Sequence, residues 1–336
     1  MCGIVGAVSF NQVPLKHDVC FNMANAIKHR GPDGSGFCLF DKSPDNISCQ
    51  ELCESTFVAQ SPTLAQIDMP VGQAIFKKKS WQLFLGHRRL AVIAPSPAGR
   101  QPFSDPSRKY WLSYNGEIYN YKELRQELIK LGFSFVTETD TEVVLTAYRA
   151  WGIDCLKRFN GMFAFALYDI NKQKLFLARD RYGIKPLYYT VTKNRKLLFA
   201  SEVKALQADP DFKNEVDCLG LAEYFSFQNF FSHRTLLKDV HLLSPASYFE
   251  IDLQKPLSLV EKSYWDFNFE ESGQLRSDKA YQDEFVYLFE QAVKRQLRSD
   301  VELGAYLSGG MDSGSITHVA ARHIENLKTF TVGFDL

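Results

Sequence analysis

Features that would place the protein in a special class are absent or scarce. No apolar run approaches the roughly 20 residues that a membrane-spanning helix requires. An excess of one charge is also absent, because 39 lysine and arginine residues balance 39 aspartate and glutamate residues. This balance does not favour nucleic acid, a membrane surface or an acidic partner. We therefore expect no nucleic acid and no membrane among the partners.

Cysteine is present, but not in a pattern that would use it structurally. The seven cysteines are odd in number and fit neither a zinc ribbon nor a disulfide framework. A cytoplasmic protein with reduced thiols is the simple interpretation. Cys49 and Cys53 could pair or bind a metal, although no second ligand pair lies nearby. A secretory signal is not indicated, since the apolar residues 1–10 lack a basic n-region and a cleavage site.

What remains is an ordinary globular composition, with 45% apolar and 23% charged residues in a chain of 336. This length allows about two domains. Residues 1–206 combine short strand patterns, Gly/Pro turns and a few helices, which is typical of an α+β domain with stacked sheets. Residues 207–265 are expected to be a connecting region. An amphipathic helix at 281–297 and a strand–helix–strand pattern at 302–334 predict the beginning of an α/β domain.

Turn and cap signals set the expected limits of the shorter elements. Asn115-Gly116 is expected to be a turn that ends a strand at 111–114. Asp140 is expected to cap a helix at 141–151. Residues 41–80 have no clean period, and a long loop or an inserted hairpin is expected there. Further strands are predicted at 4–10, 83–85, 90–93, 162–169, 174–179, 186–190 and 196–200, and helices at 19–28 and 122–131.

The first feature with chemical potential is Cys2, which follows the initiator methionine. Because residue 2 is small, removal of Met1 should expose Cys2 as the first residue. A thiol is a weak nucleophile while it is protonated. A free α-amine, with a pKa of about 7.7–8.0, would supply a base on the same Cα. The alternative is that Cys2 is only a small buried residue beside a strand.

The second feature is a set of polar residues expected on turns. A free amino acid requires a cation for its α-carboxylate, which a guanidinium supplies in bidentate form, and anions for its α-ammonium. An asparagine side chain and a glycine N–H suit the oxyanion of a tetrahedral intermediate. Taken singly, each residue could instead belong to a hairpin turn, a surface charge or a helix cap. The set comprises Arg30, Asp33, Arg89, Asn115, Gly116, Glu117 and Asp140.

The third feature is the stretch Leu-Ser-Gly-Gly-Met-Asp-Ser at 307–313. It is expected at a strand-to-helix junction, where backbone N–H groups and the helix dipole attract anions. Its two glycines let the backbone approach a phosphate closely. The stretch lacks Gly-Lys-Ser/Thr and is not a Walker loop. The continuation Asp312-Ser313 favours binding of a nucleotide pyrophosphate.

Together these stretches resemble the glutamine-hydrolysing asparagine synthetase family, in which a class II glutamine amidotransferase domain precedes an ATP-pyrophosphatase-type synthetase domain. The resemblance implies an Ntn-type αββα sandwich at 2–206 and a connecting region at 207–265. At 266–336 it implies the incomplete beginning of a PP-loop, adenine nucleotide alpha hydrolase-like α/β domain. It rests on MCGIVG (1–6), HRGPDG (29–34), GHRRL (86–90), YNGEIYN (114–120), TDTE (139–142), RDRYGIKPL (179–187), ASEVKAL (200–206) and SGGMDS (308–313), in this order.

The resemblance also implies roles for particular residues. Cys2 attacks the carboxamide carbon of glutamine, ammonia leaves, and water hydrolyses the thioester. The other residues of this site are Arg89 for the α-carboxylate, Glu117 and Asp140 for the α-ammonium, and Asn115 and Gly116 for the oxyanion. In the second domain, ATP with Mg²⁺ activates aspartate as an acyl-adenylate, and ammonia from an internal tunnel converts it to asparagine. The implied ATP-binding residues are Leu307, Ser308, Gly309, Gly310, Asp312, Ser313 and Val332, and no metal ligand is assigned.

Some departures from the family bear on these expectations. A family synthetase domain would extend roughly two hundred residues further, so we expect a truncated product or one piece of a split enzyme. It would hydrolyse glutamine without completing asparagine synthesis alone. The two parallel strands should then expose part of their apolar faces. Gly314 replaces the usual second serine, and the longer segment 41–80 could form a lid or a partner surface.

Several alternatives stay open at this stage. A related enzyme could amidate another carboxylate, such as a sugar acid or a peptide intermediate. The chain could be a glutaminase only, or a folded binding module without catalysis. A second copy in a homodimer or a complementing synthetase polypeptide is the expected macromolecular partner.

Overall fold

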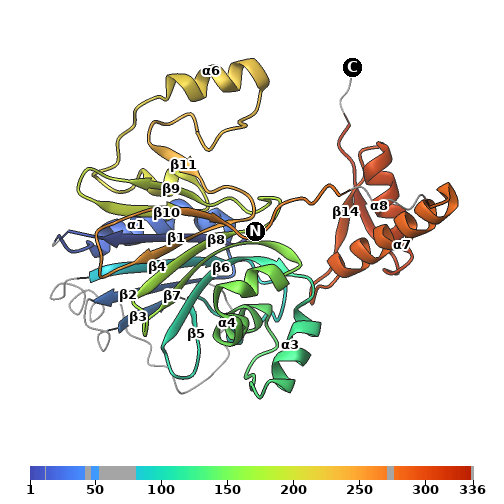
Figure 1. The fold of residues 1–336 in the computed structure, drawn as a ribbon, viewed down its shortest axis with the longest axis horizontal. Helices are drawn as coiled ribbons and strands as arrows, with labels where there is room; N and C mark the ends of the chain where they lie inside the picture. The colour runs from blue at the N-terminus through green and yellow to red at the C-terminus, as the bar shows by residue number, and fades with distance from the viewer. Residues whose placement is uncertain (12, 42–46, 53–80, 271–275, 334–336) are drawn as a thin grey trace. The chain divides into compact units, whose positions relative to one another are not determined.

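The computed structural model describes residues 1–11, 13–41, 47–52, 81–270 and 276–333 (Figure 1). The chain folds into two compact units. The first unit comprises Met1–Ala91 and Ser96–Asp266, and the second unit comprises Val92–Pro95 and Phe267–Leu336. Within the described ranges, no helix has both the length and the apolar character required of a membrane span.

The first unit contains two antiparallel sheets. Among the described residues, one sheet has seven strands in the order β11-β9-β10-β1-β4-β2-β3, and the other has six in the order β13-β12-β8-β7-β6-β5. The first sheet consists of β1 (Gly3–Ser9), β2 (Gly34–Asp41), β3 (Ile47–Leu52), β4 (Trp81–Arg89), β9 (Tyr188–Val191), β10 (Lys196–Ala200) and β11 (Val240–Leu242). The second consists of β5 (Phe103–Ser104), β6 (Tyr110–Ile118), β7 (Gly161–Asp169), β8 (Lys174–Arg179), β12 (Ser247–Asp252) and β13 (Glu261–Ser263).

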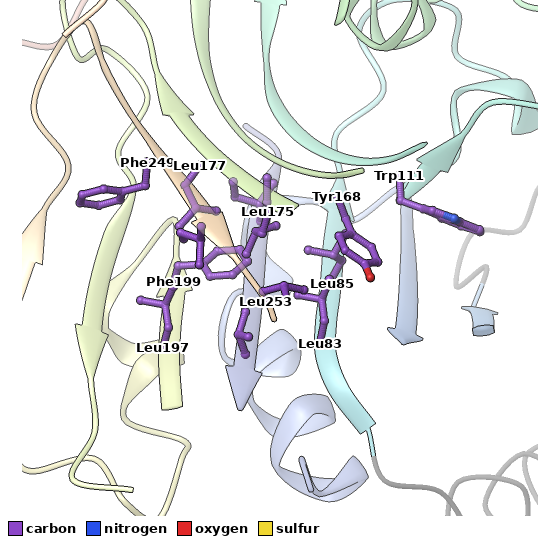
Figure 2. Close-up of a cluster of buried hydrophobic side chains, with 14 of the residues drawn as sticks. Leu83, Leu85, Trp111, Tyr168, Leu175, Leu177, Leu197, Phe199, Phe249 and Leu253 are labelled. Carbon is purple, nitrogen blue, oxygen red and sulfur yellow. The ribbon is translucent and has the colours of Figure 1, made fainter. Parts of the chain in front are cut away.

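The apolar alternation of β1 shows how the layers are stacked. Ile4 and Val8 pack into one core together with Leu175 and Leu177 of β8. Figure 2 shows Leu175 and Leu177 among the side chains of this core, between the two sheets. Side chains alternate across a strand, so Val5 and its neighbours on the other face pack beneath α1 (His17–Ala26) and α5 (Val203–Leu206). With both faces covered, every residue of β1 is buried.

Helices α3 (Tyr121–Lys130) and α4 (Asp140–Trp151) accompany the six-stranded sheet (Figure 1). The ring of Tyr148 on α4 packs against Phe176 of β8, with ring centroids 5.3 Å apart. The order of layers is therefore helix, sheet, sheet, helix. This is the αββα sandwich that the family resemblance implies.

Three local predictions around the polar residues are wrong. Asn115-Gly116 is not a turn, because β6 continues through both residues, which pair with Ala164 and Phe163 of β7. A Cβ at position 116 would lie 2.3 Å from the Met162 carbonyl oxygen, so glycine serves close strand approach here. The helix α4 is capped by Thr139, whose hydroxyl accepts from the Glu142 N–H, and Asp140 is its first residue.

The third wrong prediction is the strand at 90–93. Strand β4 runs without interruption to Arg89 and ends there. Beyond it, the Leu90 N–H donates to Cys2 Sγ at 3.2 Å and the Ala91 N–H donates to Asp33 Oδ2 at 2.8 Å. These N–H groups are used by side chains, so they do not extend a strand ladder.

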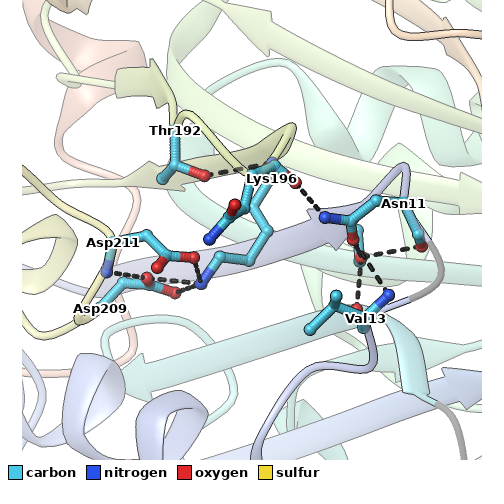
Figure 3. Close-up of polar contacts among 8 residues, drawn as sticks. Asn11, Val13, Thr192, Lys196, Asp209 and Asp211 are labelled. Carbon is cyan, nitrogen blue, oxygen red and sulfur yellow. Dashed lines mark hydrogen bonds and ion pairs between the residues drawn. The ribbon is translucent and has the colours of Figure 1, made fainter.

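The expected connecting region 207–265 adds strands to both sheets. Strand β11 pairs with β9, and β12 pairs with β8. The helix α6 (Cys218–Phe227) lies between them in sequence. The start of this region is held by Lys196 of β10, whose ammonium lies 2.5 Å from Asp209 and 2.8 Å from Asp211 (Figure 3). Most of the expected loop at 41–80, including Cys53, lies outside the described residues.

The second unit has the predicted strand–helix–strand pattern. Strand β14 (Gly304–Tyr306) is parallel to β15 (Lys328–Phe330), with α8 (Met311–Ala321) between them in sequence. Helix α7 (Asp278–Gln296) contributes Val293 to a small core with Val319 and Ala320. Tyr306 is 83% exposed and Phe330 is 57% exposed. The expectation that these strand faces are partly exposed is confirmed.

Candidate active site

Cys2 lies immediately before β1 and is held from two sides. Its Sγ accepts from the Leu90 N–H at 3.2 Å, and its carbonyl oxygen accepts from Arg30 Nε at 2.9 Å. Burial raises the pKa of the Cys2 thiol, and the Leu90 N–H, the amino terminus and Arg89 oppose this shift. The thiol is therefore protonated at neutral pH. A reaction at Sγ needs a base.

The amino terminus of the chain is adjacent to this thiol. Burial lowers the pKa of the Met1 α-amine, and the nearby charges of Arg30 and Lys185 lower it further. The ammonium of Lys185 also contacts Met1 Sδ at 3.2 Å.

Arg89 ends strand β4 and projects from its last position. Its Nη1 donates to the Ser96 carbonyl oxygen at 2.6 Å, and the Asp33 N–H donates to the Arg89 carbonyl oxygen at 3.0 Å. A Cβ on Gly99 would lie 2.0 Å from Arg89 Nη2, so the guanidinium occupies the space that glycine leaves open. Burial lowers the pKa of Arg89, whereas Cys2, Asp33 and Asp140 raise it.

Asp140 is buried at the start of α4, and its carboxylate faces β6. Its Oδ2 accepts from the Tyr114 hydroxyl at 2.8 Å and from the Ile118 N–H at 3.2 Å. Burial raises the pKa of Asp140 to about 6, against the effect of these hydrogen bonds. Burial and the charge of Asp140 also raise the pKa of Glu117. A cation bound between these two carboxylates would reduce their mutual repulsion.

Asn115 has an unused donor. The residue is 1% exposed, and its Nδ2 has no hydrogen-bond partner among the described residues. A buried amide donor without a partner is destabilising by about 1–3 kcal/mol. Such a group is expected where a ligand supplies the missing acceptor.

Mutual charge effects connect most of the predicted residues. The pKa of the Cys2 thiol responds to both Arg89 and Asp140, and Glu117 responds to Asp140 and Lys185. Asn115 and Gly116 stand between Tyr114 and Glu117 on β6. The structure thus brings together residues separated by more than a hundred positions in the chain. Asp33 and Arg30 border the same site.

Sequence reasoning missed several residues of this site. Tyr114 and Lys185 fall within stretches that carry the family resemblance, but they received no role. Glu202, which is bonded to Arg30, was missed in the same way. His87 is fully buried with its pKa lowered by burial to about 3, so it is neutral and hydrogen-bonded to the Tyr114 carbonyl oxygen. The usable signal was their place in the stretches that carry the family resemblance.

The second unit brings its predicted loop residues together at the start of α8. Gly309 has a φ of +83°, a conformation that favours glycine. The hydroxyls of Ser308 and Ser313 are 3.0 Å apart. Gly310 is the N-cap of α8 and has no side-chain cap. The first N–H groups of α8 are therefore available to an anion.

Leu307 and Val332 lie where the parallel strands end. The Leu307 N–H donates to the Phe330 carbonyl oxygen at 2.9 Å, and the Thr331 hydroxyl donates to the Leu307 carbonyl oxygen at 2.6 Å. Ligands of open α/β sheets bind beyond the carboxyl ends of the strands. The loop and the strand ends thus fit a nucleotide. Within the described part of the chain, no group of three or more His, Cys, Asp or Glu side chains could hold a metal ion.

Comparisons with known proteins agree with this architecture. The model of a glutamine amidotransferase domain matches residues 64–265, and the model of asparagine synthase matches residues 284–336. Asparagine synthetase [glutamine-hydrolyzing] 1 of Bacillus subtilis is 36% identical over 100% of the chain, which covers 46% of that protein. Asparagine synthetase [glutamine-hydrolyzing] 3 of the same organism is 38% identical over 100% of the chain, which covers 48% of that protein.

Two solved structures share the fold at 17% identity. The match to glutamine phosphoribosylpyrophosphate amidotransferase of B. subtilis covers 98% of this chain and 65% of that enzyme, with a TM-score of 0.53. The allosteric regulatory enzyme of purine biosynthesis matches the same shares at a TM-score of 0.56. These similarities show the Ntn-type fold alone.

The fold and the matches define a glutamine amidotransferase domain followed by a segment that matches asparagine synthase. The chain belongs to the glutamine-hydrolysing asparagine synthetase family, a family of enzymes. The resemblance inferred from the sequence is thereby confirmed. The chain spans about half the length of the curated relatives it matches.

Proposed function

We propose that the first unit hydrolyses glutamine with Cys2 as the nucleophile. The observation that supports this most strongly is the orphaned amide of Asn115 in a site that also holds the thiol, a guanidinium and two carboxylates. A buried donor without a partner is expected where a ligand supplies the acceptor. A developing oxyanion supplies the acceptor that Asn115 lacks.

The proposed reaction begins once Met1 is removed and the α-amine belongs to Cys2. The amine takes the proton of Sγ, and the sulfur attacks the carboxamide carbon of glutamine. Asn115 Nδ2 and the Gly116 N–H hold the negative oxygen of the tetrahedral intermediate. The amine then passes its proton to the leaving nitrogen, and the C–N bond breaks to release ammonia. Water hydrolyses the thioester, giving glutamate and the free thiol.

Recognition of the substrate follows from the fixed charges. The Arg89 guanidinium pairs with the α-carboxylate of glutamine as a two-pronged donor. The carboxylates of Glu117 and Asp140 receive the α-ammonium, which relieves their mutual repulsion.

For the second unit we propose nucleotide binding and a part in asparagine synthesis. The loop residues Ser308, Gly309, Gly310, Asp312 and Ser313 would hold the ATP phosphates, and Leu307 and Val332 would contact adenine. Mg²⁺, bound through phosphate oxygens and water, would neutralise phosphate charge. Ammonia from the first unit would meet an aspartyl adenylate, giving asparagine and AMP. Amidation of another carboxylate is the alternative that the same residues allow.

The glutaminase proposal is tested with the purified chain and its Cys2→Ala variant. Intact mass reports whether Met1 has been removed, and a coupled assay reports glutamate release. We expect turnover only from protein with Cys2 at its amino terminus, and none from Cys2→Ala at unchanged thermal stability. Cys218→Ala, at an exposed cysteine outside the site, is the matched control and should retain turnover. Glutamate release by Cys2→Ala would refute the nucleophile.

Further assays separate the alternatives for the second unit. Aspartate-dependent AMP formation from ATP with Mg²⁺ is expected if the described loop is part of a working synthetase. Glutamate release without AMP formation identifies a glutaminase or one member of a split enzyme. AMP formation with a different carboxylate would assign another acceptor. Sedimentation with and without a synthetase polypeptide tests the proposed homodimer and the proposed complementing partner.

A further inference from the structure

Glu202 follows the end of β10 and is contacted by three basic side chains. Its Oε1 lies 2.9 Å from Arg30 Nη1 and 3.0 Å from His29 Nε2, and its Oε2 lies 3.0 Å from Lys204 Nζ. Although partial burial opposes the shift, hydrogen bonds from Arg30, Lys204 and His29 lower the pKa of Glu202 to about 2. Glu202 is therefore an anion throughout the range in which an enzyme of this kind would work.

Arg30 links this anion to the proposed nucleophile. Its Nη1 is bonded to Glu202, and its Nε donates to the Cys2 carbonyl oxygen at 2.9 Å. The Arg30 side chain is only 10% exposed, and it lies against Gly3, where a Cβ would be 3.2 Å from Arg30 Cδ. The guanidinium thus bridges the carboxylate and the peptide group of Cys2 within a confined space.

Ser201, the residue before Glu202, holds strand β1 just after Cys2 and Gly3. The Ile4 N–H donates to Ser201 Oγ at 3.0 Å, and the Ser201 N–H donates to the Ile4 carbonyl oxygen at 2.9 Å. Ser201 therefore holds Ile4 directly, while Glu202 reaches Cys2 through Arg30. Two successive residues after β10 fix the backbone on both sides of Gly3.

We propose that Glu202 is a positioning residue for Cys2 and acts through the guanidinium of Arg30. The proposal rests on the function proposed above for Cys2. The hydrogen bond to its carbonyl oxygen fixes the Cys2–Gly3 peptide plane, and that plane sets the direction of the Cys2 side chain. Attack on a carboxamide requires Sγ and carbon to be aligned at about 3–3.5 Å. Without its anion, the buried Arg30 would turn towards other acceptors and release Cys2.

Glu202→Gln and Glu202→Ala test the proposal in the full chain. We expect kcat for glutamine hydrolysis to fall about tenfold in Glu202→Gln and about a hundredfold in Glu202→Ala, on the scale seen for misplaced reacting groups. The KM should stay within about twofold, because Arg89 and Asp140, not Glu202, hold the substrate. Arg30→Lys, which removes the planar two-sided donor, should lower kcat in the same way.

The matched control is Glu250→Gln. Like Glu202, Glu250 pairs with more than one basic side chain, in this case Lys174 and Lys262. Its side chain is 24% exposed, compared with 25% for Glu202. It lies on β12, and its partners Lys174 and Lys262 lie on β8 and β13. This control should retain the wild-type kcat. Equal loss of kcat in Glu250→Gln and Glu202→Gln would assign the effect to general destabilisation and overturn the proposal.

A second measurement needs no glutamine. The rate of iodoacetamide alkylation at Cys2, followed by peptide mass from pH 6 to 10, reports the position and the ionisation of the thiol directly. We expect slower alkylation and a displaced pH midpoint in Glu202→Ala, and an unchanged profile in Glu250→Gln. An unchanged Cys2 profile and kcat in a folded Glu202→Ala protein would refute the inference.

The two measurements separate this inference from the proposed function. If wild-type protein alkylates normally but releases no glutamate, the glutaminase proposal fails. The dependence of alkylation on Glu202 then still decides the positioning role. If Glu202→Ala does not fold, Glu202→Gln supplies the same comparison, because its amide oxygen still accepts a hydrogen bond from Arg30.

Discussion

The Tyr114 hydroxyl donates a hydrogen bond of 2.8 Å to Oδ2 of Asp140, and both side chains are buried. Burial raises the pKa of Asp140 to about 6, while this bond and the Ile118 N–H favour the charged form. The proposed function needs Asp140 as an anion, but its surroundings favour the neutral acid. An ionised Asp140 carboxylate in this site therefore lowers the stability of the folded protein.

Asp140→Asn should stabilise the protein at pH 7.5 and weaken its activity. The pKa of Asp140 is about 6 in the folded chain and 3.8 in the unfolded chain. The folded protein therefore loses up to about 3 kcal/mol of stability as the pH rises from below 3.8 to above 6. The neutral amide avoids this loss. We expect the free energy of unfolding in urea to increase by about 1–3 kcal/mol at pH 7.5. The kcat/KM for glutamine should fall at least about thirtyfold, because an ammonium partner is lost.

The pH dependence of the stability gain is its control. Below about pH 3, well under the unfolded pKa of 3.8, the Asp140 carboxyl is largely protonated in both the folded and the unfolded chain. The wild type and Asp140→Asn should therefore approach equal stability there. A stability gain that does not change between about pH 3 and pH 7.5 would show that burial of charge is not its cause.

Tyr114→Phe should move the acidic limb of the activity profile to higher pH. The phenol lowers the pKa of Asp140 by donating to the carboxylate, so its removal raises that pKa above 6. The acidic midpoint of kcat/KM for glutamine, measured from pH 5 to 9, should rise by up to about one unit. Turnover at pH 8.5 should change least, since Asp140 is ionised there in both proteins. A midpoint that moves to lower pH would contradict the assigned hydrogen bond.

The sequence predicts the elements better than it predicts the use of their polar residues. The apolar run of β1 and the strand–helix–strand order of β14, α8 and β15 are local patterns, and the structure confirms them. Asn115-Gly116 has the composition of a turn, yet β7 lies close enough to draw both residues into a strand. Local propensity does not register a partner strand about fifty residues away, so the tertiary context decides there.

The site shows the same limit. Cys2, Arg89 and Asp140 were found because they occur together in the stretches that carry the family resemblance, although each residue taken singly allows a structural explanation. Glu202 and Lys185 were missed because their roles depend on contacts across the fold, such as the bond from Arg30 to Glu202 over 172 positions. A charged residue in a strand-to-turn segment gives no sign in the sequence of which backbone group it will hold.

Gly99→Ala should weaken glutamine binding with little effect on stability. The new Cβ would lie 2.0 Å from Arg89 Nη2, and the clash falls on the far end of a flexible side chain. The guanidinium should move away, and KM should rise about tenfold or more while the unfolding midpoint changes little. Gly34→Ala is the matched control, because its Cβ would lie 3.9 Å from Arg89 Cβ and meet nothing closer. An equal KM for the two variants would argue against Arg89 as the carboxylate anchor.

Lys196→Met should destabilise the first unit without changing its chemistry. The ammonium lies 2.5 Å from the buried carboxylate of Asp209, which the substitution leaves without its cation (Figure 3). Removing one member of a buried ion pair is destabilising by about 3–5 kcal/mol. Urea unfolding should show this loss, and kcat of the folded protein should be unchanged. The double variant Lys196→Met with Asp209→Leu should recover part of the stability, which a simple packing defect would not.

Asn115→Ala distinguishes a packing role of the Asn115 side chain from a role in binding the oxyanion. If Nδ2 serves only packing, the variant leaves a cavity and loses stability, as large-to-small substitutions do. If Nδ2 is kept for an oxyanion, the substitution removes an unsatisfied group in the free protein, and stability should change by less than about 1 kcal/mol. In that case kcat for glutamine hydrolysis should fall about a hundred- to a thousandfold, with KM nearly constant, because the bond forms only as the oxygen becomes negative. Steady-state kinetics and urea unfolding of the same preparation distinguish these outcomes. A large stability loss with normal kcat would assign Asn115 to the core.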